Sequence, residues 1–167
     1  MKRSFLLLLV MIAGIYSCKK NDSIRTQYAK LIVGTWKSTG QNTKVYDLSS
    51  NELVKDSTIT FTGNNANRAW LEIYLANGNS YVTTIPTVKS NTIVATADTT
   101  SYLTYTILGS NLLLKQNIGG EATKPILRIN TTDMDLESTT TGTLPASWKL
   151  GINVSYKITQ STHYIRQ

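Results

Sequence analysis

Residues 69–85, AWLEIYLANGNSYVTTI, contain the pattern that decides the fold class. Two short runs with apolar or alternating side chains, residues 69–75 and 80–85, flank the tripeptide Asn77-Gly78-Asn79. Asn and Gly tolerate the positive φ angles of a tight turn whose twist matches that of two antiparallel strands. This stretch therefore predicts a β-hairpin.

Runs of the same kind, separated by Gly and Asn, recur along the chain. They cover residues 31–39, 43–48, 57–62, 69–75, 80–85, 92–97, 101–108, 111–116, 124–130, 133–138 and 152–159, and we expect residues 139–143 to form a polar loop. The 167 residues include 25 Thr, and Thr with Val, Ile and Tyr favours strands. No strand alternates with a long helical segment, which argues against a parallel α/β fold.

The predicted fold class is all-β, because many strands with short connections imply antiparallel neighbours. An open sheet of this length would expose two edges that invite aggregation. We therefore expect the meander to close into an eight-to-ten-stranded barrel, with a two-sheet sandwich as the alternative. Residues 24, 28, 31 and 32 (Ile, Tyr, Leu, Ile) have helical spacing, so a short N-terminal helix is expected before the first strand.

The N-terminus has the pattern of an export signal. Lys2 and Arg3 precede an apolar run, residues 5–15, that is shorter than the roughly 20 residues of a membrane-spanning helix. Ile15-Tyr16-Ser17-Cys18 resembles the lipobox of bacterial lipoproteins, in which the signal is cut before the cysteine and its thiol is acylated. An ordinary secretory signal with an incidental cysteine is the alternative.

This resemblance divides the chain into three parts. Residues 1–17 are the expected signal peptide, residues 18–30 the acylated Cys18 and its tether, and residues 31–167 the barrel domain. Lys19 follows the cysteine where many inner-membrane lipoproteins have Asp, so the resemblance implies a lipid anchor in the outer membrane. Either face of that membrane is compatible with the sequence.

The segment LIVGTWK, residues 31–37, resembles the Gly-x-Trp motif that opens the first strand of lipocalins and the related fatty-acid-binding proteins. Gly34 permits a close backbone approach, and Trp36 supplies a large apolar plug for the narrow end of a barrel. In this family a basic side chain near the end of the last strand lies over the Trp, which implies Arg166 here. The family's second motif, carboxy-terminal helix, disulfide and helical lid have no counterpart in this chain.

The composition excludes the commonest catalytic and zinc chemistries. One His and one Cys supply neither a Cys/His pair nor a cluster of zinc ligands. Asp133, Asp135 and Glu137 alternate with Met134 and Leu136, which predicts a solvated acidic face and an apolar inner face on one strand. A calcium site or an acid/base pair is the alternative interpretation of these acids.

The lone His163 lies in residues 161–166, outside the predicted strands, and is interpreted as a surface or rim residue. We expect no catalytic residue, no metal site and no cofactor. The Lys and Arg residues are scattered, so no nucleic-acid partner is expected.

Trp70, Glu72 and Tyr74 share one face of the strand predicted over residues 69–75, while the alternate residues are aliphatic. We expect the aliphatic face to pack in the core. We interpret the aromatic face as ordinary packing of a tyrosine-rich β surface. The alternatives are an exposed stacking platform for a sugar, or the lining of a cavity if the register were reversed. Trp70, Tyr74, Tyr81 and Tyr105 are the candidate ligand-binding residues.

Two functions are compatible with these features. The first is a non-enzymatic, membrane-anchored barrel that holds a small hydrophobic or amphipathic ligand in its interior. The second is a cell-envelope scaffold whose loops and outer strands bind a glycan or a protein. A cavity lined by aliphatic and aromatic groups would favour the first, and a filled interior with an exposed aromatic patch would favour the second.

Overall fold

The computed structural model describes residues 23–85, 88–89, 92–93, 99–116, 119–144 and 154–167. The expected signal peptide and Cys18 lie outside the described residues, as does most of the strand expected over residues 92–97. Within the described part of the chain, no helix has both the length and the hydropathy needed to cross a bilayer.

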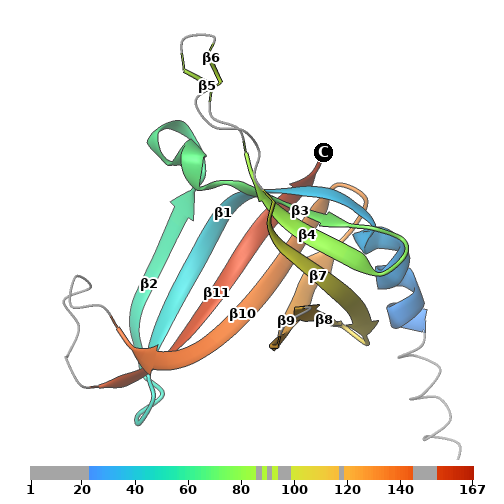
Figure 1. The fold of residues 1–167 in the computed structure, drawn as a ribbon. Helices are drawn as coiled ribbons and strands as arrows, with labels where there is room; N and C mark the ends of the chain where they lie inside the picture. Colours follow the sequence, from blue (N-terminus) through green and yellow to red (C-terminus); the bar gives the residue numbers. More distant parts are fainter. Residues whose placement is uncertain (1–22, 86–87, 90–91, 94–98, 117–118, 145–153) are drawn as a thin grey trace, which may run out of the picture.

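The fold is an antiparallel eight-stranded barrel with one extra strand, which confirms the predicted fold class (Figure 1). The strands are β1 (Gly34–Asp47), β2 (Leu53–Thr60), β3 (Trp70–Tyr74), β4 (Asn79–Thr84), β5 (Val88–Lys89), β6 (Thr92–Ile93), β7 (Thr99–Leu108), β8 (Asn111–Gln116), β9 (Glu121–Ile129), β10 (Asp133–Thr143) and β11 (Ser155–Arg166), with a 3-10 helix, Gly63–Arg68, between β2 and β3. The sheet runs β11-β10-β9-β8-β7-β4-β3-β1-β2, and pairing of β11 with β1 closes it. β5 and β6 form a separate two-stranded ribbon.

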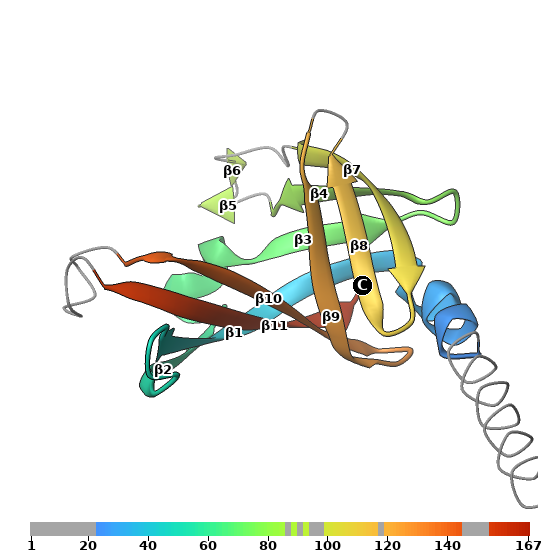
Figure 2. The same ribbon diagram turned by 90° about the horizontal axis from the view of Figure 1, so that it is seen from below.

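Three strands continue beyond the barrel because they change or lose a neighbour. β1 pairs with β3 over residues 34–37 and with β2 over residues 40–46, while β11 pairs with β1 along both parts. β10 keeps β9 as a neighbour only over residues 134–136. We use the name extension for the four-stranded sheet that is formed by β2, residues 40–47 of β1, residues 155–163 of β11 and residues 137–143 of β10. It projects away from the barrel in Figures 1 and 2.

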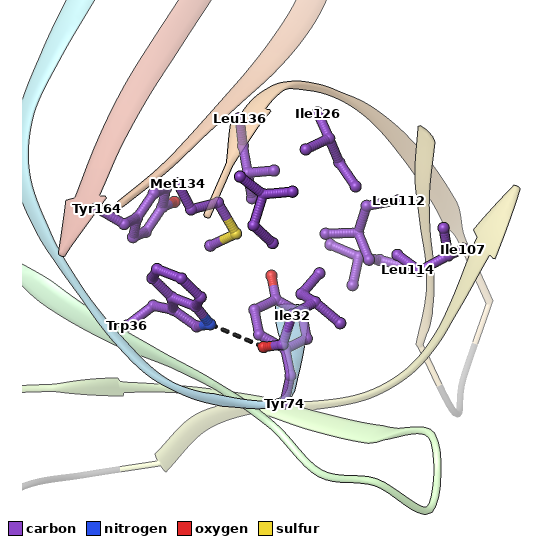
Figure 3. Close-up of a cluster of buried hydrophobic side chains, with 11 residues drawn as sticks. Ile32, Trp36, Tyr74, Ile107, Leu112, Leu114, Ile126, Met134, Leu136 and Tyr164 are labelled. Carbon is purple, nitrogen blue, oxygen red and sulfur yellow. Dashed lines mark hydrogen bonds between the residues drawn. The ribbon is translucent and has the colours of Figure 1, made fainter. Parts of the chain in front are cut away.

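The barrel interior is filled at one end by buried side chains from the N-terminal helix and from β1, β3, β7, β8, β9, β10 and β11 (Figure 3). They are Ile32, Trp36, Tyr74, Ile107, Leu112, Leu114, Ile126, Ile129, Met134, Leu136 and Tyr164. The N-terminal helix, residues 23–32, lies beside this end, and its Tyr28 and Leu31 pack against the same cluster. The structure confirms the expected helix. We call this end of the barrel the closed end.

The predicted hairpin is confirmed. β3 and β4 are adjacent and antiparallel, and the Leu75 N–H donates to the Asn79 carbonyl at 2.8 Å. Gly78 has φ of 85° in the turn, a conformation that favours glycine. The Asn77 side chain accepts a 3.0 Å hydrogen bond from the Asn79 N–H, so the turn residues act as their sequence predicts.

The predicted loop over residues 139–143 is wrong, because these residues continue β10 and pair with residues 155–159 of β11. Thr has a high preference for strands, and the partner strand supplies backbone hydrogen bonds that a loop would leave to water. Thr139 and Thr159 face each other across the pair, with their hydroxyl oxygens 3.4 Å apart. β11 likewise continues to Arg166, so His163 lies within a strand.

The two runs predicted over residues 31–39 and 43–48 form one strand. β1 begins at Gly34, because residues 31 and 32 belong to the helix, and it runs to Asp47. An irregularity in its pairing with β11 lies between Ser38 and Gly40. This point marks the change of neighbour from β3 to β2, so the polar residues around it bend the strand rather than ending it.

The predicted inner face of β3 is also wrong. Glu72 and Tyr74 are buried and Trp70 is half-buried, whereas Leu75 is exposed. The aliphatic residues of this run therefore point outward, and the residues with polar handles point into the barrel. On β10 the predicted alternation is correct, because Met134 and Leu136 are both buried.

Candidate ligand-binding site

The closed end is sealed by the Trp36 indole. Trp36 is fully buried, and its Nε1–H donates a 2.7 Å hydrogen bond to the carbonyl of Ile32, the last residue of the helix (Figure 3). The guanidinium of Arg166 lies over the ring, with Cζ 4.5 Å from the centroid. Such stacking pairs a cation with the negative face of the indole.

Arg166 also ties the end of β11 to the segment that enters β1. Its Nη1 donates a 2.9 Å hydrogen bond to the Val33 carbonyl, and its Nη2 donates to the Leu31 carbonyl. Gly34 has φ of 146°, and a Cβ there would lie 2.7 Å from Nη1 of Arg166. The structure thus brings together the three residues that the lipocalin resemblance implies, and Gly34 provides the space for the guanidinium.

A buried carboxylate lies in the interior next to this plug. Glu72, only 3% exposed, is directly opposite Trp36 in the β1–β3 pair. Its Oε2 accepts a hydrogen bond from the Tyr74 hydroxyl. Its Oε1 accepts from the Tyr164 hydroxyl at 2.6 Å and from Trp70 Nε1 at 3.1 Å.

Lys124 on β9 completes this arrangement from the other side of the barrel. Its Nζ lies 3.4 Å from Oε1 of Glu72, so one interior cation faces one interior anion. We call Glu72, Lys124, Trp70, Tyr74 and Tyr164 the interior polar cluster. Burying a charge is unfavourable unless it is paired and hydrogen-bonded, and the cluster meets both conditions for Glu72.

The electrostatics keep Glu72 ionised at neutral pH. Burial raises the pKa of its carboxyl, but Lys124 and the hydrogen bonds from Tyr164, Tyr74 and Trp70 together bring that pKa below its usual value. The pKa values of Tyr74 and Tyr164 are raised well above the ordinary range. Burial is the largest cause, and the negative charge of Glu72 is the second. Both phenols therefore remain protonated and act as donors.

Part of the interior polar cluster reaches solvent. The Lys124 side chain is 25% exposed, whereas that of Glu72 is 5% exposed. Trp70 and Leu103, which face the interior from β3 and β7, are also half-buried. Lys124, Trp70 and Leu103 are therefore partly exposed side chains that adjoin the buried Glu72 or the core cluster.

Ser80 adds an unsatisfied polar group to the interior. It is 3% exposed, and it is paired with Tyr74 across β3 and β4, on the inward face. Its Oγ has no hydrogen-bond partner among the described residues. Buried hydroxyls are normally satisfied by protein or by ordered water, so this atom is a free donor and acceptor inside the barrel.

The four aromatic candidates divide into two groups. Trp70 and Tyr74 belong to the interior polar cluster, and Tyr105 packs edge-on against Tyr74 with ring centroids 5.2 Å apart. Tyr81 pairs with Ile73, so it lies on the outer face, apart from the others. Sequence reasoning thus selected three aromatic residues that lie near one another, without identifying the carboxylate that two of them bind.

Glu72, Lys124 and Tyr164 were missed as site residues. The signal for Glu72 was its position as the one acid between Trp70 and Tyr74 in an apolar run. Lys124 had no comparable signal, because pairing of β8 with β9 determines the face on which it lies.

The acids of β10 form a separate cluster on the outside of the barrel. Asp135 accepts from His163 Nδ1 at 2.6 Å and pairs with Arg128 Nε at 2.8 Å, and Asp133 lies 3.7 Å from His163 Nε2. The Ser161 hydroxyl donates to Glu137, the third acid of β10, at 3.4 Å. His163 thus bridges β10 and β11 on the outer surface.

A shallow groove of about 320 Å³ adjoins this cluster on the outer face of the extension. Hydroxyl and amide side chains line most of it, including Asn42, Thr58, Thr60 and Ser161, and His163 lies at its edge. Gly40 forms part of the floor, and a Cβ there would be 3.0 Å from the Ile59 carbonyl oxygen, so packing of β1 on β2 accounts for this glycine.

The fold is an antiparallel barrel closed by eight strands and filled at one end, which is consistent with a calycin-like barrel. No protein-family model matches the chain, and no curated protein matches it significantly. Among the residues that the structure describes, no group of three or more His, Cys, Asp and Glu side chains has an arrangement that could hold a metal ion.

Proposed function

We propose that this protein is a lipid-anchored, lipocalin-like envelope protein whose barrel binds one small amphipathic molecule without catalysing a reaction. The observation that carries the proposal is the interior polar cluster. Replacing a buried ion pair by packed apolar residues is often neutral or stabilising, so stability alone does not account for Glu72 and Lys124 in a barrel core.

The cluster defines the chemistry of the ligand. Lys124 has three N–H donors, and within the described residues its only polar contact is Glu72 at 3.4 Å. A ligand with an acceptor or anionic head group would bind the remaining donors at the exposed side of this ammonium. Trp70 and Leu103 would contact its apolar part, since both are half-buried and face the interior.

The closed end limits the size of such a ligand. Trp36, Met134 and Leu136 are buried and fill the interior at the closed end, so a ligand would bind only in the part of the barrel that they leave free. An eight-stranded barrel holds either side chains alone or one small ligand.

Native mass spectrometry of residues 19–167 after gentle purification tests the ligand proposal. We expect a retained small-molecule mass, and displacement of bound anilinonaphthalene sulfonate by the extracted compound. Lys124→Met should abolish both, whereas Lys115→Met, which removes an outward-facing lysine paired with Glu121, should leave them unchanged. An apo mass together with no dye binding in the parent protein would contradict the proposal.

Cys18 tests the membrane anchor separately. In cells that acylate lipoproteins, the parent chain should incorporate labelled palmitate and partition with the membrane, because several acyl chains give essentially permanent attachment. Cys18→Ser should abolish labelling. Release of the parent protein without detergent would contradict the anchor and leave the ligand proposal intact.

The outer groove supports a second candidate function, a scaffold that binds an envelope glycan. The groove exposes mostly carbon atoms, which would pack against the apolar face of a sugar ring, and its Thr, Ser and Asn side chains would bind sugar hydroxyls at the edges. Binding of envelope polysaccharide that is lost in Thr58→Val/Ser161→Val, and kept in Lys124→Met, would favour this function over the interior site.

A further inference from the structure

Exposed apolar side chains gather around the closed end of the barrel. Leu108 and Leu127 are 51% and 54% exposed, and Leu75 and Ile165 are 37% and 38% exposed. They lie at or next to the ends of β7, β9, β3 and β11, where these strands meet the helix end of the molecule. Solvent-exposed Leu and Ile side chains grouped at one end indicate an interaction surface more strongly than the same residues scattered singly.

Two cations occupy the same end. Arg25 and Lys30 project from the helix and line a groove of about 410 Å³ between the helix, the β3–β4 turn and β7. Ala29, Val33 and Ile107 also line this groove, and no acid does. Within the described part of the chain, neither Arg25 nor Lys30 forms an ion pair with an Asp or Glu.

We infer that the closed end rests on a bilayer of anionic phospholipids, with the apolar side chains in the interfacial region and Arg25 and Lys30 on the phosphates. A surface that combines Leu and Ile with unpaired Arg and Lys matches the boundary between acyl chains and anionic head groups. A second copy of the chain would present the same two cations to Arg25 and Lys30, so charge complementarity favours lipid.

The position of the anchor agrees with this orientation. The described chain begins at residue 23, at the start of the helix, and Cys18 is five residues earlier. Even fully extended, five residues span only about 17 Å. The inference rests on the proposed function only for the acyl group at Cys18. The lipid contact itself requires only Arg25, Lys30 and the exposed apolar side chains.

Vesicle flotation with residues 19–167, which lack Cys18 and contain the whole described barrel, isolates this surface from the anchor. The probes are vesicles of phosphatidylglycerol with phosphatidylethanolamine, and vesicles of phosphatidylcholine alone. We expect binding to the anionic vesicles only, and weakening with added salt because exposed charges are screened. Arg25→Glu/Lys30→Glu and Leu108→Ser/Leu127→Ser should each lower the bound fraction at least tenfold.

Matched controls come from the opposite end of the molecule. Leu53→Ser/Val54→Ser changes two apolar residues that are 47% and 39% exposed, and Lys44→Glu/Lys157→Glu reverses two charges of the extension. Both should leave flotation unchanged. Near-ultraviolet circular dichroism should show that every variant retains its folded core.

Three results would overturn the inference. The first is that the parent protein does not float with anionic vesicles, and the second is that the matched controls lose as much flotation as the closed-end variants. The third is a concentration-dependent dimer without vesicle binding, because a dimer would assign the surface to a second copy of the chain. Binding of anilinonaphthalene sulfonate without vesicles reports the interior site, so failure of the lipid surface is distinguishable from failure of the ligand proposal.

Discussion

The barrel and the extension are built from the same strands, yet their inner faces differ. In the barrel, β1 contributes Trp36 and β11 contributes Tyr164, both buried in one cluster. In the extension, the same faces carry Gln41 and Gln160, which are only half-buried. Val45 and Tyr156 are the buried hydrophobic residues of the extension within the part of the chain that the structure describes.

This difference shows that large apolar side chains come together in a core because the sheet closes into a barrel, and not merely because the residues form strands. Residues 34–38 of β1 lie where β3 and β11 curve around a shared interior, so large apolar side chains meet one another. Residues 40–47 lie between β2 and β11 in an open sheet, where Thr and Gln are tolerated on both faces. We therefore expect most of the stability of the molecule to reside in the closed end.

Trp36→Ala should have the largest effect. It removes a fully buried indole and leaves a cavity beneath Arg166, which should lower the free energy of unfolding by about 3–5 kcal/mol. Urea denaturation of residues 19–167 measures this change. An unchanged midpoint would show that Trp36 does not hold the closed end together.

Glu72→Gln should destabilise the protein by about 3 kcal/mol, near the lower limit for a broken buried ion pair because Lys124 reaches solvent. The effect should depend on pH. The pKa of Glu72 is lowered in the folded state from its usual value near 4.5, so its contribution is complete above that pH and is lost as the pH falls through the lowered pKa.

Denaturation curves at neutral pH and at pH below 4 check both statements. The difference between the parent protein and the Glu72→Gln variant should shrink on acidification. A difference that stays constant or grows would contradict an ionised, stabilising Glu72. Asp47 and Asp133, whose pKa values are also lowered, are present in both proteins and do not contribute to the difference.

Gly34→Ala should lower the free energy of unfolding by about 2 kcal/mol, a typical value for a residue held in an unfavourable backbone conformation. The added Cβ also meets the Arg166 guanidinium at 2.7 Å. Gly109→Ala is the matched control, because Gly109 also has positive φ but nothing lies within 4 Å of the position that a Cβ would take there. Equal effects of the two substitutions on the thermal midpoint would show that the contact with Arg166 is unimportant.

Tyr46→Leu, in the extension, should have the smallest effect. Lys157 Nζ lies 5.2 Å from the centroid of the Tyr46 ring, and both residues are half-buried near the surface, where a cation–π contact contributes about 0.5–1 kcal/mol. Thermal denaturation should therefore show a shift much smaller than that of Trp36→Ala. A comparable shift would remove the distinction between the two regions.

Sequence reasoning predicted the parts of the fold that depend on local pattern. The alternation around Met134 and Leu136 identified the inner face of β10, and Asn77-Gly78-Asn79 identified a turn. The barrel, the helix and the adjacent strands follow from such patterns because turn chemistry and side-chain alternation act over a few residues.

The interior polar cluster could not be predicted in the same way. In the run that forms β3, an aliphatic face and an aromatic face were both plausible cores, and a one-residue shift of register exchanges them. Long-range pairing with β1 and β4 decided that Glu72 points inward, where Tyr164 and Lys124 satisfy it. Residues 139–143 were assigned to a loop for a similar reason, since their strand conformation depends on pairing with residues 155–159 of β11.

Hydrogen–deuterium exchange of residues 19–167 tests the central claim that β11 closes the barrel onto β1 while the extension stays open. Amides of residues 34–38 and 164–166 should exchange slowest and at the same rate, because opening either strand breaks the closure, and amides of residues 139–143 should exchange much faster. Fast exchange at residues 164–166 beside slow exchange at residues 34–38, or protection of the extension equal to that of the closed end, would contradict the account.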